Sequence, residues 1–154
     1  MSAVEELVTK LLLPARLLLV ESDKRQADAL RQQIQAQYEC AVDWAGCGLE
    51  AQHRLGQNKY DLLLLASTPQ DVSVREFLRQ VKATAPAVPV ILVTGFPGTF
   101  VAEEAAACGI VSVLTRPVSQ GDIDDLFRVF KVRVRSKEDT RHFQSRNGLR
   151  PVAA

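Results

Sequence analysis

Along the chain, short apolar runs alternate with longer stretches in which apolar residues recur every three or four positions. Four runs are nearly continuous, over 16–21, 61–66, 88–94 and 110–115, and a fifth, over 40–45, is more mixed. Apolar runs of this length without a polar alternation are typical of strands buried on both faces, as in a parallel sheet. The pattern therefore predicts five strands.

Helical patterns lie between these runs. Asp23 can cap a helix that continues to Tyr38, and further helices are expected over 48–57, 73–85, 99–108 and 119 to about 134. Pro86 should end the third of these helices and Gly109 the fourth. Five strands alternating with five helices predict a doubly wound α/β sandwich with right-handed crossovers.

Two segments lie outside this alternation, so the expected organisation has three parts: an N-terminal extension over 1–14, a domain over 15–134 and a tail over 135–154. The extension has an amphipathic helical pattern and needs something to dock on. The tail is polar, basic and without periodicity, so it is expected to be flexible or ordered by a partner. From Lys131 onward there are seven basic and two acidic residues, a net charge of +5, against −4 for the rest of the chain.

The composition favours a soluble, cytoplasmic protein. Hydrophobic residues make up 47% and charged residues 24% of the chain, and no apolar run reaches the eighteen or more residues that a membrane span needs. The apolar part of the N-terminus follows Glu5 and Glu6, unlike a secretory signal. The three cysteines show no C-x-x-C spacing, so no zinc site or disulfide framework is indicated.

The candidate site follows from the fold class. Open parallel sheets bind ligands outside the carboxyl ends of their strands, near the switch in strand order. The first strand ends in Glu21 and Ser22, the third in Ala66, the fourth in Thr94 and the fifth in Arg116. These residues are therefore expected to meet at one edge of the sheet.

In order and spacing, several short motifs resemble the receiver domain of bacterial two-component response regulators. They are V-E-S-D, G-L-E-A-Q-H-R-L, Y-D-L-L-L-L, P-V-I-L-V-T-G and A-C-G-I-V-S-V-L-T-R-P-V, and together they cover about 16–130. The resemblance implies a flavodoxin-like sheet with strand order 2-1-3-4-5. It also implies a cis peptide between Arg116 and Pro117, as in the family's Lys-Pro pair.

The resemblance also identifies the positions on which the family's activity depends. An acid pair that binds Mg²⁺ falls at Glu21 and Ser22, the phosphorylated aspartate at Ala66, and the phosphate-binding hydroxyl at Thr94. The family's lysine is replaced by Arg116, and its aromatic switch residue falls at Val113, which cannot take that role.

These replacements remove the family's chemistry. The methyl group of Ala66 is no nucleophile, and Mg²⁺ requires hard oxygen ligands, of which only Glu21 remains among three expected acids. Asp23 is more readily a helix cap than a replacement ligand. The sequence therefore predicts a pseudo-receiver with no catalytic residue, no metal site and no cofactor. We also expect Arg116 to form a charge-assisted hydrogen bond with Glu21, potentially bidentate, with Thr94 alongside.

Three functional interpretations remain open. The first is a non-enzymatic, phosphorylation-independent module that binds a histidine kinase or another signalling protein. By analogy with the family, its contact face would be the fourth helix, fifth strand and fifth helix, with residues 102–107, 111–113 and 122–134. The second is a regulator whose extension dimerises or whose basic tail contacts nucleic acid, the latter disfavoured because the tail has few aromatics and no helix-turn-helix pattern. The third is a conventional phosphotransfer protein with an unorthodox acceptor.

Overall fold

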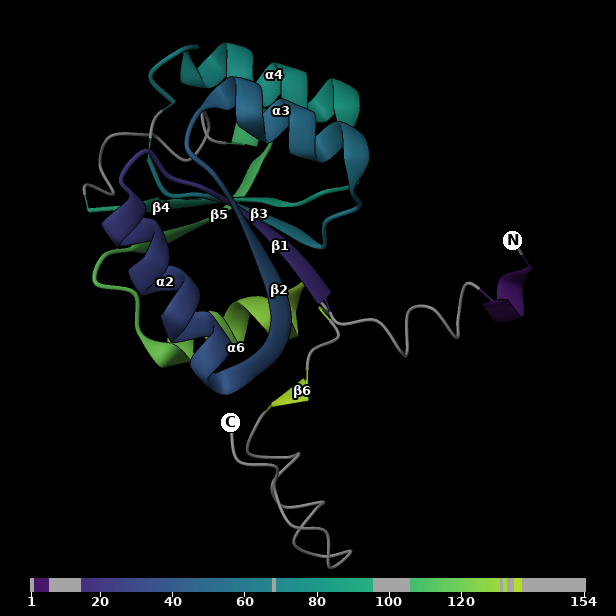
Figure 1. Ribbon diagram of the computed structural model, residues 1–154, viewed down its shortest axis with the longest axis vertical. Coiled ribbons are helices and arrows are strands. Elements are labelled where there is room, and N and C mark those ends of the chain that lie inside the picture. The colour runs from purple at the N-terminus through teal and green to yellow at the C-terminus, as the bar shows by residue number, and fades with distance from the viewer. Residues whose placement is uncertain are drawn as a thin grey trace, which may run out of the picture.

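The computed structural model describes residues 2–5, 15–67, 69–95, 106–130, 132 and 135–136 of the chain. Five parallel strands form its core: β1 (Ala15–Val20), β2 (Tyr38–Ala45), β3 (Leu62–Leu65), β4 (Val90–Thr94) and β5 (Ile110–Thr115). Their order, β5-β4-β3-β1-β2, confirms the predicted receiver-like topology (Figure 1). The positions of β1 and β3 at the centre explain why their leucines are buried on both faces.

A sixth, antiparallel strand extends the sheet beyond the five that were predicted. This strand, β6 (Arg135–Ser136), pairs with Tyr38 and Glu39 at the edge of β2. It lies in the segment for which the sequence indicated no secondary structure. The expected helix from 119 to about 134 is also shorter, because α6 spans Gln120–Val129 and Phe130 is its C-cap. Val132 is then buried in the core, which brings the chain back toward the sheet.

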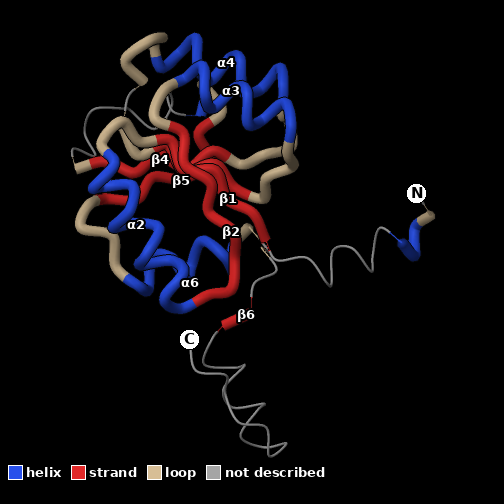
Figure 2. The backbone as a smooth tube through the Cα atoms, in the orientation of Figure 1, coloured by secondary structure: helices blue, strands red, loops and turns tan. Residues whose placement is uncertain are grey.

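The helices cover both faces of the sheet in the arrangement shown in Figure 2. On one face lie α3 (Gly48–Gln57) and α4 (Val74–Thr84), and on the other lie α2 (Lys24–Gln37) and α6. The side chains of Asp23, Ser73 and Ser119 accept hydrogen bonds from the first-turn amides of α2, α4 and α6, so each of these helices begins at a capping residue. The caps explain why the predicted starts of these three helices hold.

Two hydrophobic cores result, one on each face of the sheet. Leu17, Leu19, Leu62 and Leu64 point toward α2 and α6, and alternate leucines of the same strands point toward α3 and α4. Phe77 of α4 is fully buried in the second core. Burial on both faces thus explains the apolar runs of β1, β3 and β4, but it is wrong for β5, an edge strand on which Val111 and Val113 are exposed.

The amino edge of the sheet carries a polar network that joins three segments. The Tyr60 hydroxyl donates to Asp43 Oδ2 at 2.7 Å, and Arg16 Nη1 donates to Asn58 Oδ1 at 2.8 Å. The Arg16 amide donates to Asp61 Oδ2 at 2.9 Å, while the Asp61 amide donates to the Arg16 carbonyl at 2.8 Å. Burial, together with the hydrogen bond to Asp43, raises the pKa of Tyr60 to about 12. The hydrogen bonds of this network hold the start of β1 against the turn before β3.

Several predictions concern residues outside the described ranges. Most of the expected helix over 99–108 lies there, although Gly109 at its end has a φ of +87°, in agreement with its expected role as a C-cap. In the N-terminal extension only 2–5 are described, with 3–5 helical and Val4 exposed. The tail beyond Ser136 is outside the described part of the chain.

Candidate functional site

The residues expected at the carboxyl edge of the sheet line one cavity of about 270 Å³. They come from four different strand ends, and are Glu21, Ser22, Ala66, Thr94 and Arg116. Parallel strands place their carboxyl ends at the same edge, so the meeting of these residues follows from the strand order. The remaining wall is mixed: apolar residues come from β3, β4 and the first residue of α4, and polar ones are Asp23, Gln26 and Ser67.

Ala66 lies directly after β3, and it is the residue that the resemblance assigned to the phosphorylated aspartate. It is 6% exposed, and its amide donates to the Val20 carbonyl at 2.9 Å, which continues the pairing of β3 with β1. Its carbonyl accepts a hydrogen bond from Arg116 Nη2 at 2.6 Å. The residue thus contributes a methyl group to the cavity wall and a backbone oxygen to the bonding of Arg116.

Arg116 and Glu21 form an ion pair, but not the hydrogen bond that was expected. The distance from Arg116 Nη2 to Glu21 Oε1 is 3.8 Å, too long for a hydrogen bond. The bidentate arrangement is therefore wrong, and the reason is that the guanidinium donates to the Ala66 carbonyl instead. Thr94, at the end of β4, lines the same cavity, as expected.

Glu21 is the only charged residue that is buried among the described part of the chain, with 2% of its surface exposed. Its Oε2 atom is inaccessible to solvent and has no hydrogen-bond partner among the described residues. A buried carboxylate oxygen without a donor is costly, because the water that it loses is not replaced. This unsatisfied oxygen is the least expected feature of the site.

The two loops above the cavity are joined by serines rather than by acids. Ser67 Oγ accepts a hydrogen bond from the Ser22 amide at 2.9 Å and lies 3.3 Å from Ser22 Oγ. Ser67 therefore bridges the loops that follow β1 and β3. Asp23 caps α2 by accepting from the Arg25 amide at 2.8 Å, as predicted.

The described residues contain no group of three histidine, cysteine or acidic side chains that could hold a metal ion. Of the described residues that line the cavity, Glu21 and Asp23 carry carboxylates, and Asp23 is engaged as a cap. This donor set is too poor in oxygen ligands to fit the Mg²⁺ of the receiver family.

Two further expectations concern the fifth strand and the residues after it. The Arg116-Pro117 peptide is cis, as the resemblance implied. Val113, which the resemblance assigned to the switch position, is 40% exposed, and Val111 on the same strand is 55% exposed.

Asp71, between β3 and α4, is a structural residue that the sequence reasoning missed. Its two carboxylate oxygens accept from the amides of Gly48 and Leu49 at 2.8 and 2.9 Å, which caps α3 from another part of the chain. These backbone hydrogen bonds lower the pKa of Asp71. A Cβ on Gly48 would come within 2.6 Å of Val72, so only glycine fits against this loop. No local sequence signal links positions so far apart.

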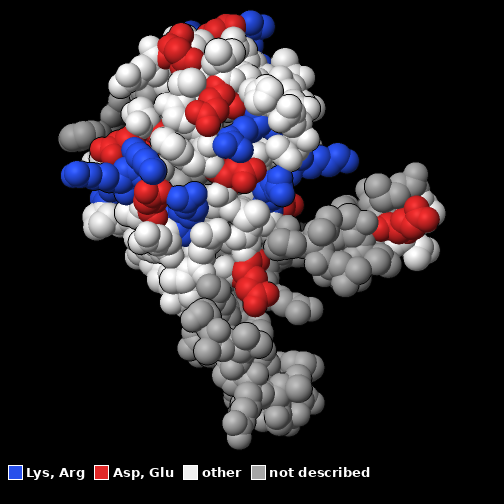
Figure 3. Space-filling view, in the orientation of Figure 1, with Lys and Arg blue, Asp and Glu red and all other residues white. Residues whose placement is uncertain are grey.

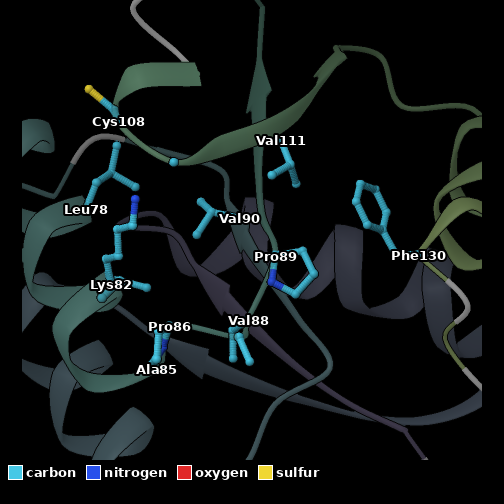
Figure 4. Close-up of a pocket in the computed structure, with 13 residues that line it drawn as sticks. Leu78, Lys82, Ala85, Pro86, Val88, Pro89, Val90, Cys108, Val111 and Phe130 are labelled. Carbon is cyan, nitrogen blue, oxygen red and sulfur yellow. The ribbon is translucent and has the colours of Figure 1, made fainter.

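A second cavity of about 330 Å³ lies beside the amino ends of β4 and β5 (Figure 4). Its lining is mostly apolar, and Val88, Val90, Val111, Cys108 and Phe130 surround it, with Lys82 of α4 at one side. It contains no group of acidic or nucleophilic residues resembling a catalytic site. On the face shown in Figure 3, basic and acidic side chains are interspersed, without a large area of one sign.

Comparison with known proteins decides the family. The model of the response regulator receiver domain matches residues 17–128. The chain belongs to the receiver domain family. No curated protein sequence matches the chain at a significant level. The family places this receiver in two-component signal transduction, where receivers work through contacts with other signalling proteins.

Solved receiver structures have the same fold at low sequence identity. One is a CheY-like receiver domain from Methanospirillum hungatei JF-1, 21% identical, covering 77% of this chain and 91% of its own, with a TM-score of 0.63. A two-component response regulator from Clostridium difficile is 18% identical over 77% of this chain and 97% of its own, with a TM-score of 0.67. The response regulator domain of Thermotoga maritima CheB is 23% identical over 77% and 94%, with a TM-score of 0.62. Within the described residues, no helix is both long and apolar enough to span a membrane.

Proposed function

We propose that this receiver domain has lost phosphoryl transfer and regulates a signalling partner through phosphorylation-independent contacts. The observation that carries the proposal is Ala66, a methyl group at the end of β3 in the cavity where the family has its acceptor carboxylate. Phosphoryl transfer to a carboxylate needs that carboxylate as the nucleophile. The domain is accordingly a binding module and not an enzyme.

The charge balance of the site supports the same proposal. A working receiver needs Mg²⁺ to neutralise its clustered acids and the incoming phosphoryl group. Here Glu21 is opposed by Arg116 at 3.8 Å, so an internal cation already takes part of that role. Because Arg116 is also bonded to the Ala66 carbonyl, the pair favours one conformation of this edge over the two between which a switch alternates.

The test is to restore the missing groups one set at a time. The wild-type protein should take up no phosphoryl group from acetyl phosphate and Mg²⁺, and beryllofluoride should leave its amide NMR spectrum unchanged. The variant Ser22→Asp/Ala66→Asp/Arg116→Lys returns the acceptor, the second acid and the lysine, and it should gain Mg²⁺-dependent phosphorylation. Ala66→Asp alone is the matched control for the acceptor without its metal site.

Phosphorylation of the wild-type protein at any residue near the cavity would overturn the proposal in favour of an unorthodox acceptor. Ser67 is the described hydroxyl to examine first, by mass spectrometry of the labelled peptide. Its Oγ is already engaged with Ser22, and no general base among the described residues is bonded to it. We therefore expect no label there.

For the partner contact we propose the exposed edge formed by β5 and the end of α6. Val111, Val113 and Val129 are 55%, 40% and 64% exposed and give this edge an apolar character. Apolar side chains gathered at one edge are suited to protein binding. The proposed partner is a histidine kinase or another signalling protein, as is usual for receivers.

This surface can be tested with a matched pair of variants. Val113→Glu should weaken binding to a purified partner, first identified with the wild-type protein. Leu49→Glu, which changes an even more exposed apolar residue on α3, should leave binding unchanged. Equal effects of the two substitutions would show that the contact does not depend on β5.

A further inference from the structure

The first residues of the chain form the start of a helix with an apolar side. The Glu5 amide donates to Ser2 Oγ at 3.2 Å and the Ser2 amide donates to Glu5 Oε2 at 3.3 Å, the reciprocal pair of a capping box. Val4, in this first turn, is 69% exposed. It is also the first of the apolar positions 4, 7, 8, 11 and 12, whose spacing predicts one apolar stripe along a helix. A helix this short is stable in water only where such a stripe is buried.

The cavity beside the amino ends of β4 and β5 offers a place for that stripe. It has a volume of about 330 Å³, and its side chains are apolar apart from Lys82 and Cys108 (Figure 4). Val111, on its wall, is 55% exposed. Lys82 is the only charged residue of the lining, and it has no hydrogen bond or ion pair with another described residue. The cavity thus combines an uncovered apolar wall with one unpaired cation.

We infer that the N-terminal extension docks across this cavity, with Leu7, Val8 and Leu11 inserted and its acidic first turn beside Lys82. This is the mode in which an amphipathic helix binds a groove through anchors three, four and seven positions apart. The occupant is therefore a segment of the same chain. The inference concerns the opposite edge of the sheet from Ala66 and does not depend on the loss of phosphoryl transfer.

The length of the extension fits this position. β1 begins at Ala15, and because the strands are parallel, its amino end lies at the same edge of the sheet as those of β4 and β5. In the strand order β4 is two spacings from β1 and β5 is three, which correspond to about 10 and 14 Å. Pro14 disfavours a helical residue before it. The three steps from Leu12 to Ala15 can span about 10 Å, and a helix over 3–12 adds about 15 Å, so the stripe can cross both strand ends.

The charges of the two parts are complementary. Glu5 and Glu6 lie at the start of the extension, and Lys82 is the cation of the cavity. Exposed ion pairs contribute little free energy, so these charges fix the direction of the helix while the apolar side chains hold it. Val111 lines the cavity and also belongs to the edge proposed for the partner. A partner at that edge would then have to displace the extension, a consequence that alone rests on the proposed function.

The test is methyl NMR of the full chain without any partner. Nuclear Overhauser contacts are expected between the methyl groups of Leu7 or Leu11 and those of Val88 and Val111. Leu7→Glu should abolish them, because a carboxylate without a partner is costly to place against an apolar wall. Leu7→Ala should lower the equilibrium constant for docking by about 10- to 100-fold, the burial of one leucine side chain.

Thr9→Glu is the matched control, because it introduces the same charge at a position outside the stripe. It should leave the contacts unchanged. Lys82→Glu should weaken docking by about 2- to 5-fold, and adding Glu5→Lys and Glu6→Lys to that variant should restore it.

The inference is overturned if the wild-type protein shows no such contacts or if Thr9→Glu removes them as Leu7→Glu does. Contacts found only between differently labelled chains in a mixed sample would also overturn it, because they would assign the cavity to a second copy. Since docking is measured in the absence of a partner, its failure is read separately from a failure of the partner edge.

Discussion

The hydrogen bonding of polar side chains differs between the amino edge and the carboxyl edge of the sheet. At the amino edge, Tyr60 is hydrogen-bonded to Asp43 at 2.7 Å and Arg16 to Asp61 at 2.8 and 2.9 Å, and an ion pair of 3.7 Å between Arg16 and Asp43 links the two pairs. At the carboxyl edge, Glu21 has one oxygen without a donor and an ion pair of 3.8 Å. Polar groups that only hold a fold together are selected for complete bonding. Among the described residues, Glu21 Oε2 is the one side-chain oxygen that is buried without a partner, and the nitrogens Gln52 Nε2 and Arg54 Nε on α3 are in the same state.

The largest effect is expected from Arg116→Met. The variant would leave Glu21 buried without its counter-charge, and it would also lose the hydrogen bond to the Ala66 carbonyl. Removing one partner of a buried pair is strongly destabilising, so the free energy of unfolding should fall by about 3 kcal/mol. Chemical denaturation at neutral pH measures this. A loss smaller than about 1 kcal/mol would mean that Glu21 is not held as a charged group.

Tyr60→Phe tests the amino edge of the sheet. It should lower the free energy of unfolding by about 1–3 kcal/mol, because it removes a hydrogen bond to a carboxylate. It should also change the response to alkaline pH. The pKa of Tyr60 is raised to about 12 in the folded protein from its ordinary value of 10.0. Its stabilising contribution is thus complete below pH 10 and is lost as the pH rises toward 12. The variant should show a flatter pH profile there, and an unchanged slope would contradict the assignment.

Glu21→Gln should change the free energy of unfolding by less than about 1 kcal/mol in either direction. The substitution removes an unsatisfied buried charge, and Arg116, whose side chain is 31% exposed, can be solvated without it. Arg116→Met alters the other partner of the same ion pair, and we expect it to lower the free energy of unfolding much more. Denaturation curves of the two variants side by side measure it, and equal losses would refute it.

Asp71→Asn is expected to change the stability least at neutral pH, and to change how steeply the stability falls in acid. The pKa of Asp71 is lowered by the Gly48 and Leu49 amides, so its contribution is present above its ordinary value of 3.8 and lost as the pH falls through the lower folded value. The melting temperature of the wild-type protein should therefore decrease in that range more steeply than that of the variant. Parallel slopes would show that the cap does not depend on the charge.

Most of the fold could be predicted because its signals are local. The leucine runs of β1 and β3, and the capping residues Asp23, Ser73 and Ser119, are read from neighbouring positions. The short strand β6 and the early end of α6 could not be predicted, because both depend on pairing with β2 and on burial of Val132. These are tertiary interactions that no window of sequence contains.

The residues that form the site could be predicted from the sequence, but the hydrogen bonds between them could not. Strand order alone brings Glu21, Ala66, Thr94 and Arg116 together. Which acceptor Arg116 bonds depends on atomic positions. Its guanidinium donates to the Ala66 carbonyl and does not make a bidentate contact with Glu21. The Asp71 cap and the Tyr60–Asp43 bond were missed for a similar reason, since each joins residues far apart in the chain.

The strand order also sets the distance between β5, the edge proposed for the partner, and β6. The edge proposed for the partner is β5, and β6 lies at the opposite end of the sheet, with β4, β3, β1 and β2 between them. Five spacings of about 4.8 Å separate the two edges by roughly 24 Å. A partner docked on β5 would therefore lie at the opposite end of the sheet from β6.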